Sequence, residues 1–310
     1  MQCVKCEEKA VIKLQHGAYC KEHFLSYFEE KVMRTFRQFK LLDQHDVVCV
    51  AASGGKDSLC ALYMTHLFCK EHHIPLFALL IDEGIAGYRD HTKEDLELFC
   101  GKYGITVHTA SYRENFGRTL DELAPIAKVQ LGKKPCTVCG VFRRTLLNRF
   151  AKKYGATKLV TGHNLDDEAQ AYVMNIIQGN MRQNASLGPM SGLTDHDGYV
   201  RRIKPLYFVS EKETRLFCLL KGFDVHFAEC PNIGDSFRAR VRDSLNALEE
   251  EFPSVKHGII QSFLSIMPEL KKKYLDERGS FSTCKVCGDP CSGEICTACS
   301  LAEVLGCKTT

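Results

Sequence analysis

The chain has 310 residues, of which 45% are hydrophobic; this is enough to bury an α/β core and excludes a fully disordered protein. Its formal net charge of +3 is compatible with a nucleic-acid partner but does not require one. No stretch approaches the roughly 20 continuous apolar residues of a membrane helix, and residues 1–6 lack the apolar core of a secretory signal. We therefore expect a cytoplasmic protein with no membrane-spanning part.

Apolar residues recur with strand or helix spacing along most of the chain. The predicted strands cover residues 47–52, 76–81, 105–109, 158–161 and 224–228. The predicted helices cover residues 24–39, 57–71, 92–102, 140–154, 166–178, 211–221, 237–251 and 256–275, and residues 179–198 are predicted to form a long loop. Strands that alternate with helices are typical of a mostly parallel sheet covered on both faces.

Ligands of such sheets bind beyond the carboxyl ends of the strands, so the loops after Ala52, Ile81 and Thr161 are expected to meet at one site. The first of these loops follows a buried strand and opens a helix. It offers backbone N–H groups, a lysine and a hydroxyl to a phosphate chain, and its members are Ser53, Gly54, Gly55, Lys56, Asp57 and Ser58. The spacing is not that of a Walker A loop, which disfavours an ordinary P-loop NTPase.

Ser-Gly-Gly-Lys-Asp-Ser resembles the loop of the ATP-pyrophosphatase, or PP-loop, family, whose members adenylate a substrate and release pyrophosphate. The resemblance implies an HUP-like fold in which these six residues bind ATP phosphates and Mg²⁺. It also implies a second nucleotide-facing loop at 162–168, where Gly162, Asp166 and Asp167 would contact ATP and magnesium. An ordinary acidic helix N-terminus is the alternative there. Ile81 and Asp82 would face the adenosine, although Asp82 could instead cap a turn.

The 17 cysteines fall into spaced groups that favour metal sites over disulfides. Two sets have the spacing of a tetrahedral zinc site with four ligands, and we expect each to bind a structural Zn²⁺. The first set is Cys3, Cys6, Cys20 and His23, and the second is Cys284, Cys287, Cys296 and Cys299.

A third group combines the pair Cys136 and Cys139 with the distant Cys230. Three thiolates of this kind fit a persulfide and disulfide relay, or three-point ligation of an iron–sulfur cluster with one open iron. A third zinc site would need a fourth ligand that the sequence does not offer.

The PP-loop, the three cysteines and the two terminal zinc modules together resemble the tRNA thiolases, including the TtcA and TtuA groups and the wobble-uridine thiolase of archaea and the eukaryotic cytosol. The resemblance implies that Cys136, Cys139 and Cys230 hold a [4Fe-4S] cluster. It implies a reaction in which ATP adenylates the C2 oxygen of a tRNA uridine, sulfur replaces that oxygen, and Lys56 and Asp57 assist. Among the tRNA positions that these thiolases modify, the resemblance favours the wobble uridine as the target.

Several alternatives stay open at this stage. The target could be a T-loop uridine or a cytidine, and sulfur could pass through a persulfide relay. The sulfur donor could be sulfide or the thiocarboxylate of a ubiquitin-like carrier. Other readings are an amide-forming PP-loop tRNA ligase and a non-catalytic zinc-ribbon scaffold that binds RNA. The resemblance also implies a homodimer.

The expected domains are an N-terminal zinc module (1–26), a linking helix (27–45), a PP-loop catalytic domain (46–245), a helical segment (246–280) and a C-terminal zinc ribbon (281–310).

Overall fold

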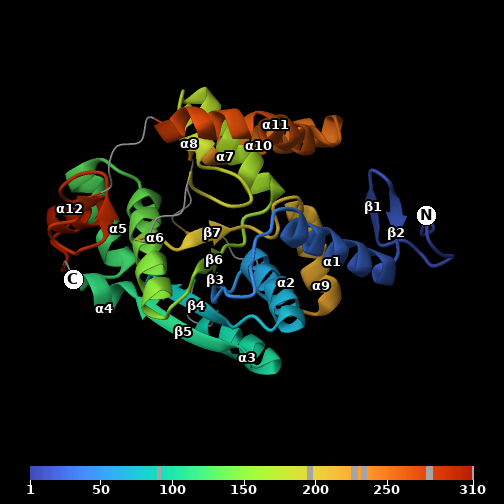
Figure 1. The fold of residues 1–310 in the computed structure, drawn as a ribbon, viewed down its shortest axis with the longest axis horizontal. Coiled ribbons are helices and arrows are strands. Elements are labelled where there is room, and N and C mark those ends of the chain that lie inside the picture. Colours follow the sequence, from blue (N-terminus) through green and yellow to red (C-terminus); the bar gives the residue numbers. More distant parts are fainter. Residues whose placement is uncertain (89–91, 194–197, 225–229, 232–235, 277–281, 309–310) are drawn as a thin grey trace.

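A computed structural model describes residues 1–88, 92–193, 198–224, 230–231, 236–276 and 282–308 (Figure 1). Its strands are β1 (Ile12–Leu14), β2 (Gly17–Tyr19), β3 (Val48–Ala51), β4 (Leu76–Asp82), β5 (Thr106–Ser111), β6 (Lys158–Val160), β7 (Arg201–Ile203), β8 (Ser282–Thr283) and β9 (Pro290–Cys291). Its helices are α1 (Lys21–Gln38), α2 (Lys56–His72), α3 (Thr92–Tyr103), α4 (Tyr112–Phe116), α5 (Leu120–Leu131), α6 (Pro135–Lys153), α7 (Leu165–Ile177), α8 (Met181–Ala185), α9 (Glu211–Lys221), α10 (Phe237–Glu251), α11 (Val255–Asp276) and α12 (Thr297–Val304).

The centre of the molecule is a five-stranded sheet in the order β5-β4-β3-β6-β7, in which every pairing is parallel. The predicted α/β class is therefore confirmed. Alternate residues of β3 enter different cores, because successive side chains of a strand point to opposite faces. Val48 and Val50 pack with α1, α2 and α9, whereas Cys49 packs with α5 and α6. Helices thus cover both faces of the sheet.

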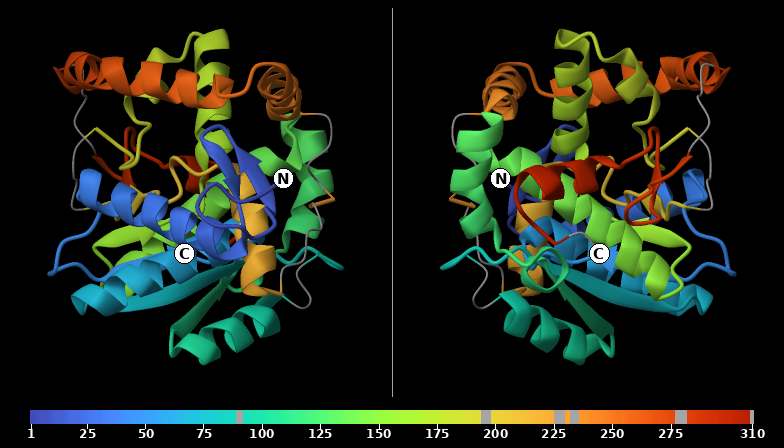
Figure 2. Two further views of the ribbon diagram at one scale, coloured as in Figure 1. Left: turned by 90° about the vertical axis from the view of Figure 1, so that its right-hand side faces the viewer. Right: turned by 90° about the vertical axis from the view of Figure 1, so that its left-hand side faces the viewer.

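A separate layer of helices lies above the sheet, at the top of both views in Figure 2. It consists of α7, α8, α10 and α11, and α7 carries the second predicted nucleotide loop at its start. The layer has a small core of its own, which includes Leu165, Val241 and Ile260. This arrangement brings the C-terminal helices onto a loop that lies far from them in the sequence.

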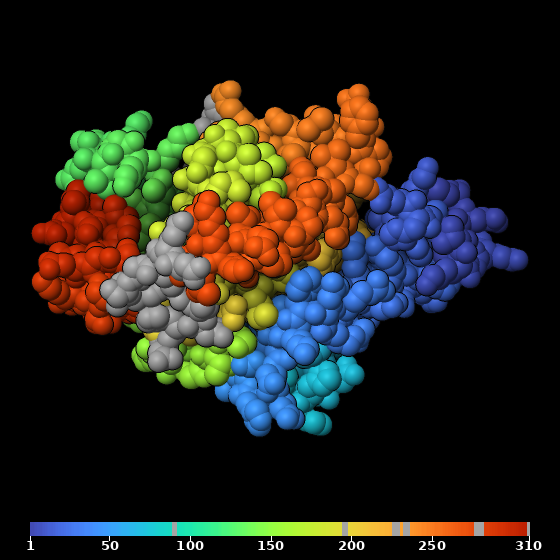
Figure 3. All heavy atoms as spheres, turned by 45° about the horizontal axis from the view of Figure 1, so that its top comes forward, coloured from blue at the N-terminus to red at the C-terminus, as the bar shows by residue number. Residues whose placement is uncertain are grey.

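The terminal modules lie at opposite ends of the long axis (Figure 3). The β1–β2 hairpin leads directly into α1 at Cys20. The C-terminal module packs against α6, where the Arg149 guanidinium lies 2.8 Å from the Asp289 carboxylate. No helix in the described part of the chain is long and apolar enough to cross a bilayer.

Most predicted elements appear within a few residues of their expected bounds, with four instructive differences. Helix α6 begins at Pro135 rather than at residue 140, because proline is well suited to the first helical position. Strand β7 was missed since two of its three residues are arginines. Helices α4 and α5 were missed, and the predicted loop 179–198 contains the short helix α8. Most of the predicted strand 224–228 lies outside the described residues.

The aromatic side chains of α1 form a buried packing surface. Phe28 and Phe217 of α9 are fully buried, and their rings stack with centroids 4.1 Å apart. Replacing Phe28 with alanine removes the ring and leaves a cavity in the core, so we expect a loss of about 3–5 kcal/mol in the free energy of unfolding. Chemical denaturation measures this free energy. The exposed Leu98 is the control, for which alanine should change stability by less than about 0.5 kcal/mol. Equal effects at the two positions would contradict this packing.

Candidate active site

The loops after β3 and β6 touch because these strands are neighbours in the sheet. A Cβ atom added to Gly162 would lie 2.7 Å from the Asp57 carbonyl carbon and 2.9 Å from the Ser58 nitrogen. The Asn164 side-chain amide donates to Asp57 Oδ1 over 3.1 Å. Two loops separated by about a hundred residues of sequence therefore form one surface, as the parallel arrangement predicts.

The phosphate loop is held by its own hydroxyls and by one left-handed glycine. Gly54 has φ +73°, a conformation that side chains disfavour. Ser58 Oγ accepts from the Ser53 N–H over 3.0 Å and donates to the Gly55 carbonyl over 2.9 Å. Gly55 caps α2 without a side-chain hydrogen bond, so the first N–H groups of the helix remain available to an anion.

Lys56 lies between two carboxylates. Its Nζ is 3.0 Å from Asp57 Oδ2 and 2.8 Å from Glu211 Oε1. Burial lowers the pKa of Lys56, but the two carboxylates more than offset this and raise it overall, so the ammonium is charged. Glu211 is the first residue of α9 and was not predicted from the sequence, which gives no signal that this helix end reaches the phosphate loop.

Asp57 and Asp167 are the carboxylates best placed to hold a cation with phosphates. Burial raises the pKa of Asp57, although Lys56 opposes the shift. Burial likewise raises the pKa of Asp167, and Arg238, whose Nη2 lies 2.8 Å from Asp167 Oδ1, opposes it. Each carboxylate thus has a cationic partner but incurs a desolvation cost that a divalent ion would relieve.

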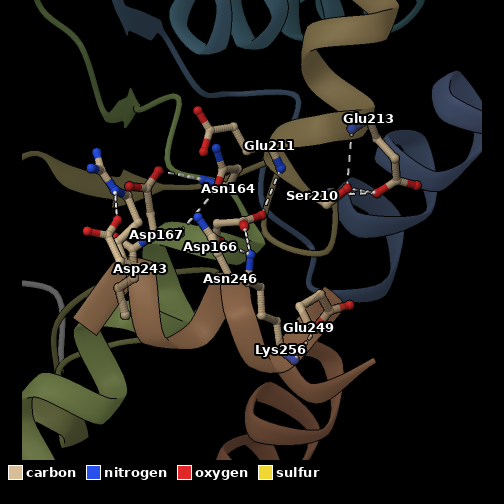
Figure 4. A network of polar contacts seen from close by, with 12 residues as sticks. Asn164, Asp166, Asp167, Ser210, Glu211, Glu213, Asp243, Asn246, Glu249 and Lys256 are labelled. Carbon is tan, nitrogen blue, oxygen red and sulfur yellow. Dashed lines mark hydrogen bonds and ion pairs between the residues drawn. The ribbon is translucent and has the colours of Figure 1, made fainter. Parts of the chain in front are cut away.

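Unlike Asp57 and Asp167, Asp166 uses both carboxylate oxygens in contacts with other parts of the chain (Figure 4). Its Oδ2 accepts from the Glu211 N–H over 2.8 Å, and its Oδ1 accepts from Lys256 Nζ. Lys256 also donates to Asn246 Oδ1 over 2.6 Å, and both Asp166 and Lys256 are buried. Asp166 therefore joins the start of α9 to α10 and α11, beside the predicted ATP contacts.

A cavity of about 380 Å³ lies at the end of β4, next to the phosphate loop. Its lining includes Ile81 and Asp82, both predicted to face adenosine, together with Gly84, Thr92 and Thr109. Asp82 Oδ1 accepts from the Gly84 N–H over 2.8 Å, so this carboxylate caps the turn as the alternative reading expected. The cavity has a suitable place and size for a nucleoside.

The cysteine pair lies in the first turn of α6, at the same edge of the sheet as the two loops. Cys139 is buried and Cys136 is exposed, while Cys230 is partly exposed. Burial raises the pKa of Cys136, and the charge of Cys230 adds to the shift. Tyr112 donates its hydroxyl to the Cys139 carbonyl over 2.8 Å, with Cys139 Sγ at 3.7 Å. Cys230 packs against the same core that contains Cys139, so the three predicted cysteines lie in one region of the molecule.

Arg143 accompanies this centre, one helical turn after Cys139. Its guanidinium lies 3.5 Å from the buried Glu83 carboxylate. Burial raises the pKa of Cys139 overall, and the Arg143 charge offsets part of this rise. Neither Arg143 nor Glu83 was predicted as a site residue, although Arg143 follows the CxxC pair in the sequence.

Both terminal ligand sets are assembled, each with its ligand atoms within 4.8 Å of one another. Cys6 and Cys20 have sulfur atoms 3.7 Å apart, and His23 Nδ1 lies 3.3 Å from each. Cys287 and Cys296 have sulfur atoms 3.7 Å apart. A tetrahedron with Zn–S bonds of about 2.3 Å has edges of about 3.8 Å, so both sets have the geometry to hold a metal ion.

Comparisons with known proteins support the identification of the first loop as a PP-loop. Residues 26–249 match the family model of the PP-loop domain. The chain belongs to the PP-loop family. It is 35% identical to "tRNA 2-thiolation protein NcsA" of Haloferax volcanii over 98% of both chains. It is 34% identical to "tRNA-5-methyluridine(54) 2-sulfurtransferase" of Pyrococcus horikoshii, over 96% of this chain and 93% of that protein.

A solved structure extends the likeness to the fold. The "U34-tRNA thiolase NcsA from Methanococcus maripaludis with its [4Fe-4S] cluster" has a TM-score of 0.80 and 33% identity, covering 98% of this chain and 96% of that one. "Cytoplasmic tRNA 2-thiolation protein 1" of Danio rerio is 34% identical over 98% of this chain and 88% of its own. The resemblance to PP-loop tRNA 2-thiolation enzymes is therefore confirmed.

The contact at Gly162 leads to a first prediction for this site. Alanine there would put a methyl group against backbone atoms of Asp57 and Ser58 and push the two loops apart. We expect ATP affinity, measured by isothermal titration calorimetry, to fall by about 100-fold, equivalent to about 2.7 kcal/mol. Gly258 of α11 is the control, because its added Cβ meets nothing within 4 Å. Unchanged affinity in Gly162→Ala would contradict the contact.

The Asp166–Lys256 pair leads to a second prediction. Lys256→Met leaves a buried carboxylate without its cation, which should lower the free energy of unfolding by about 3–5 kcal/mol. Adding Asp166→Asn removes the unpaired charge and should restore part of that loss. Chemical denaturation of both single variants and the double variant tests this. Strictly additive losses would show that the two side chains are not coupled.

Proposed function

We propose that this protein catalyses the ATP-dependent 2-thiolation of a uridine in tRNA. The single observation that carries the proposal is a CxxC pair at the start of α6, with Cys139 hydrogen-bonded to Tyr112 directly after β5, at the same sheet edge as the loops after β3 and β6. An amide-forming ligase of the same family has no use for such a centre. The names of relatives aligned along almost the whole chain support the same reading.

ATP would bind with its phosphates at the start of α2 and its adenosine in the cavity at the end of β4. Ser53, Gly54, Gly55 and Ser58 would supply the cradle, and Lys56 would offset the phosphate charge. Asp57 and Asp167 would hold Mg²⁺, with Gly162 and Asp166 fixing the second loop. The uridine C2 oxygen then attacks the α-phosphate, and pyrophosphate leaves. Sulfur replaces the adenylated oxygen, and AMP is released.

Cys136, Cys139 and Cys230 would hold the [4Fe-4S] cluster. When bound, that cluster supplies a reactive sulfur or the iron that carries it. The donor set fits, because it offers three thiolates, one of them exposed, and a nearby arginine to balance their charge. Tyr112 would orient Cys139. Each terminal set would hold one structural Zn²⁺, consistent with its closed group of four ligands.

We place the reaction at the wobble uridine, in the cytoplasm, with a homodimer as the working form. The printed name of the Methanococcus maripaludis neighbour specifies U34, whereas that of the Pyrococcus horikoshii relative specifies position 54. Mass spectrometry of anticodon-loop and T-loop fragments from treated tRNA separates the two. For the sulfur donor we propose free sulfide or a ubiquitin-like thiocarboxylate carrier.

Iron and acid-labile sulfide, measured on protein purified without oxygen, test the cysteine centre. We expect both in the wild type and a loss of both in Cys136→Ala, Cys139→Ala and Cys230→Ala, because three-point ligation leaves no spare protein ligand. Cys307, a partly exposed thiol outside the three ligand sets, is the control, and Cys307→Ala should keep both. Zinc alone, with no cluster after reconstitution, would contradict the proposal and favour a persulfide relay.

A further inference from the structure

Two arginines meet on one face of the sheet beside the cysteine centre, outside the ATP loops. The anchor is Asn148 of α6, which accepts from the Val200 N–H over 2.9 Å and donates to the Gly198 carbonyl over 3.1 Å. Arg144 lies one helical turn before Asn148, on the same side of α6. Arg202 lies two residues after Val200, so it points to the same side of its strand.

The sheet register gives the same placement independently. Arg202 pairs with Leu159 of the neighbouring parallel strand, so both side chains lie on one face of the sheet. Leu159 is buried in the core that contains Phe142 and Leu146 of α6. Arg202 therefore faces α6, as Arg144 faces β7.

These two guanidiniums lack the carboxylates that their neighbours have. Arg143 pairs with Glu83 and Arg149 pairs with Asp289. Within the described ranges, no ion pair or hydrogen bond is formed by either Arg144 or Arg202. Burial and the Arg144 charge lower the pKa of Arg202 to about 10, and burial and the Arg143 charge lower that of Arg144. Like charges crowded in this way cost stability, and an anionic ligand would recover that cost.

The pair is also accessible and close to the chemistry. Arg144 is exposed and Arg202 is partly exposed. A Cβ atom added to Gly140, the residue after Cys139, would lie 3.2 Å from Arg144 Nη1, so this guanidinium leans over the turn that carries the cysteine pair. The ATP phosphates have their own cradle at α2. An anion held by Arg144 would lie beside the sulfur centre instead.

We propose that Arg144 and Arg202 form an anion subsite for a backbone phosphate of the RNA strand that presents its base to the cysteine centre. Guanidinium forks match phosphate oxygens in pairs, which fixes position as well as charge. Phosphate contacts set the register of a nucleic acid without reading its sequence. This subsite rests on the proposed tRNA substrate, and it would hold the target nucleotide in place for sulfur transfer.

Binding of unmodified tRNA transcript, followed by fluorescence anisotropy at several salt concentrations, tests the subsite. Arg144→Gln and Arg202→Gln should each weaken binding about tenfold and lower the slope of log Kd against log salt by about 1. The exposed Lys152 in the last turn of α6 is the matched control, and Lys152→Gln should change neither quantity. Arg144→Lys and Arg202→Lys should keep the slope, which separates charge from misfolding.

The outcomes are distinct from those that test the function itself. ATP affinity and iron content should stay at wild-type values in both glutamine variants. A variant that carries both Arg144→Gln and Arg202→Gln but keeps the RNA affinity and the salt slope of the wild type would overturn the subsite. A loss of ATP affinity that left RNA binding intact would also overturn it. Wild-type protein that neither binds nor thiolates tRNA would overturn the proposed function instead.

Discussion

The contact between the loops after β3 and β6 is the constraint on which the rest of the site depends. The sheet order makes these strands neighbours, and Gly162 lets the second loop lie against the backbone of Asp57 and Ser58. Only glycine leaves room for this approach. The contact brings Asp57 and Asp167 to one surface, while the amides that open α2 face the same space. Without this contact, the carboxylates of the second loop would not lie beside the phosphate loop.

The helical layer depends on that surface in turn. Two adjacent acidic residues of the second loop form ion pairs with the C-terminal helices. Asp166 pairs with Lys256, and Asp167 pairs with Arg238. The Asp166 carboxylate also fixes the start of α9, whose first side chain, Glu211, reaches Lys56. A continuous polar path thus runs from α11 to the phosphate loop. Arg238 lies in the first turn of α10, so this helix also supports the second loop.

The sequence predicted the α/β class and the motifs of the candidate site, but not all of the elements and contacts around them. Short motifs such as residues 53–58 identify themselves because their chemistry needs fixed residue types at fixed spacing. The two four-ligand sets at the ends of the chain were equally predictable, since ligand spacing is local, and the structure assembles both. Strand β7 was not, because Arg201 and Arg202 break any apolar run and only the sheet edge next to β6 makes them a strand. Long-range partners such as Glu211 for Lys56, or Lys256 for Asp166, have no sequence signature and emerge only when the chain is folded.

Reconstitution of the reaction tests the central claim most directly. Protein purified without oxygen and subjected to cluster reconstitution would be incubated with ATP, Mg²⁺, sulfide and unmodified tRNA transcript, and the nucleosides and nucleotides analysed by mass spectrometry. We predict 2-thiouridine in the tRNA and one AMP with one pyrophosphate for each sulfur inserted. ADP and phosphate as the nucleotide products, or AMP and pyrophosphate with no thiolated nucleoside, would contradict it.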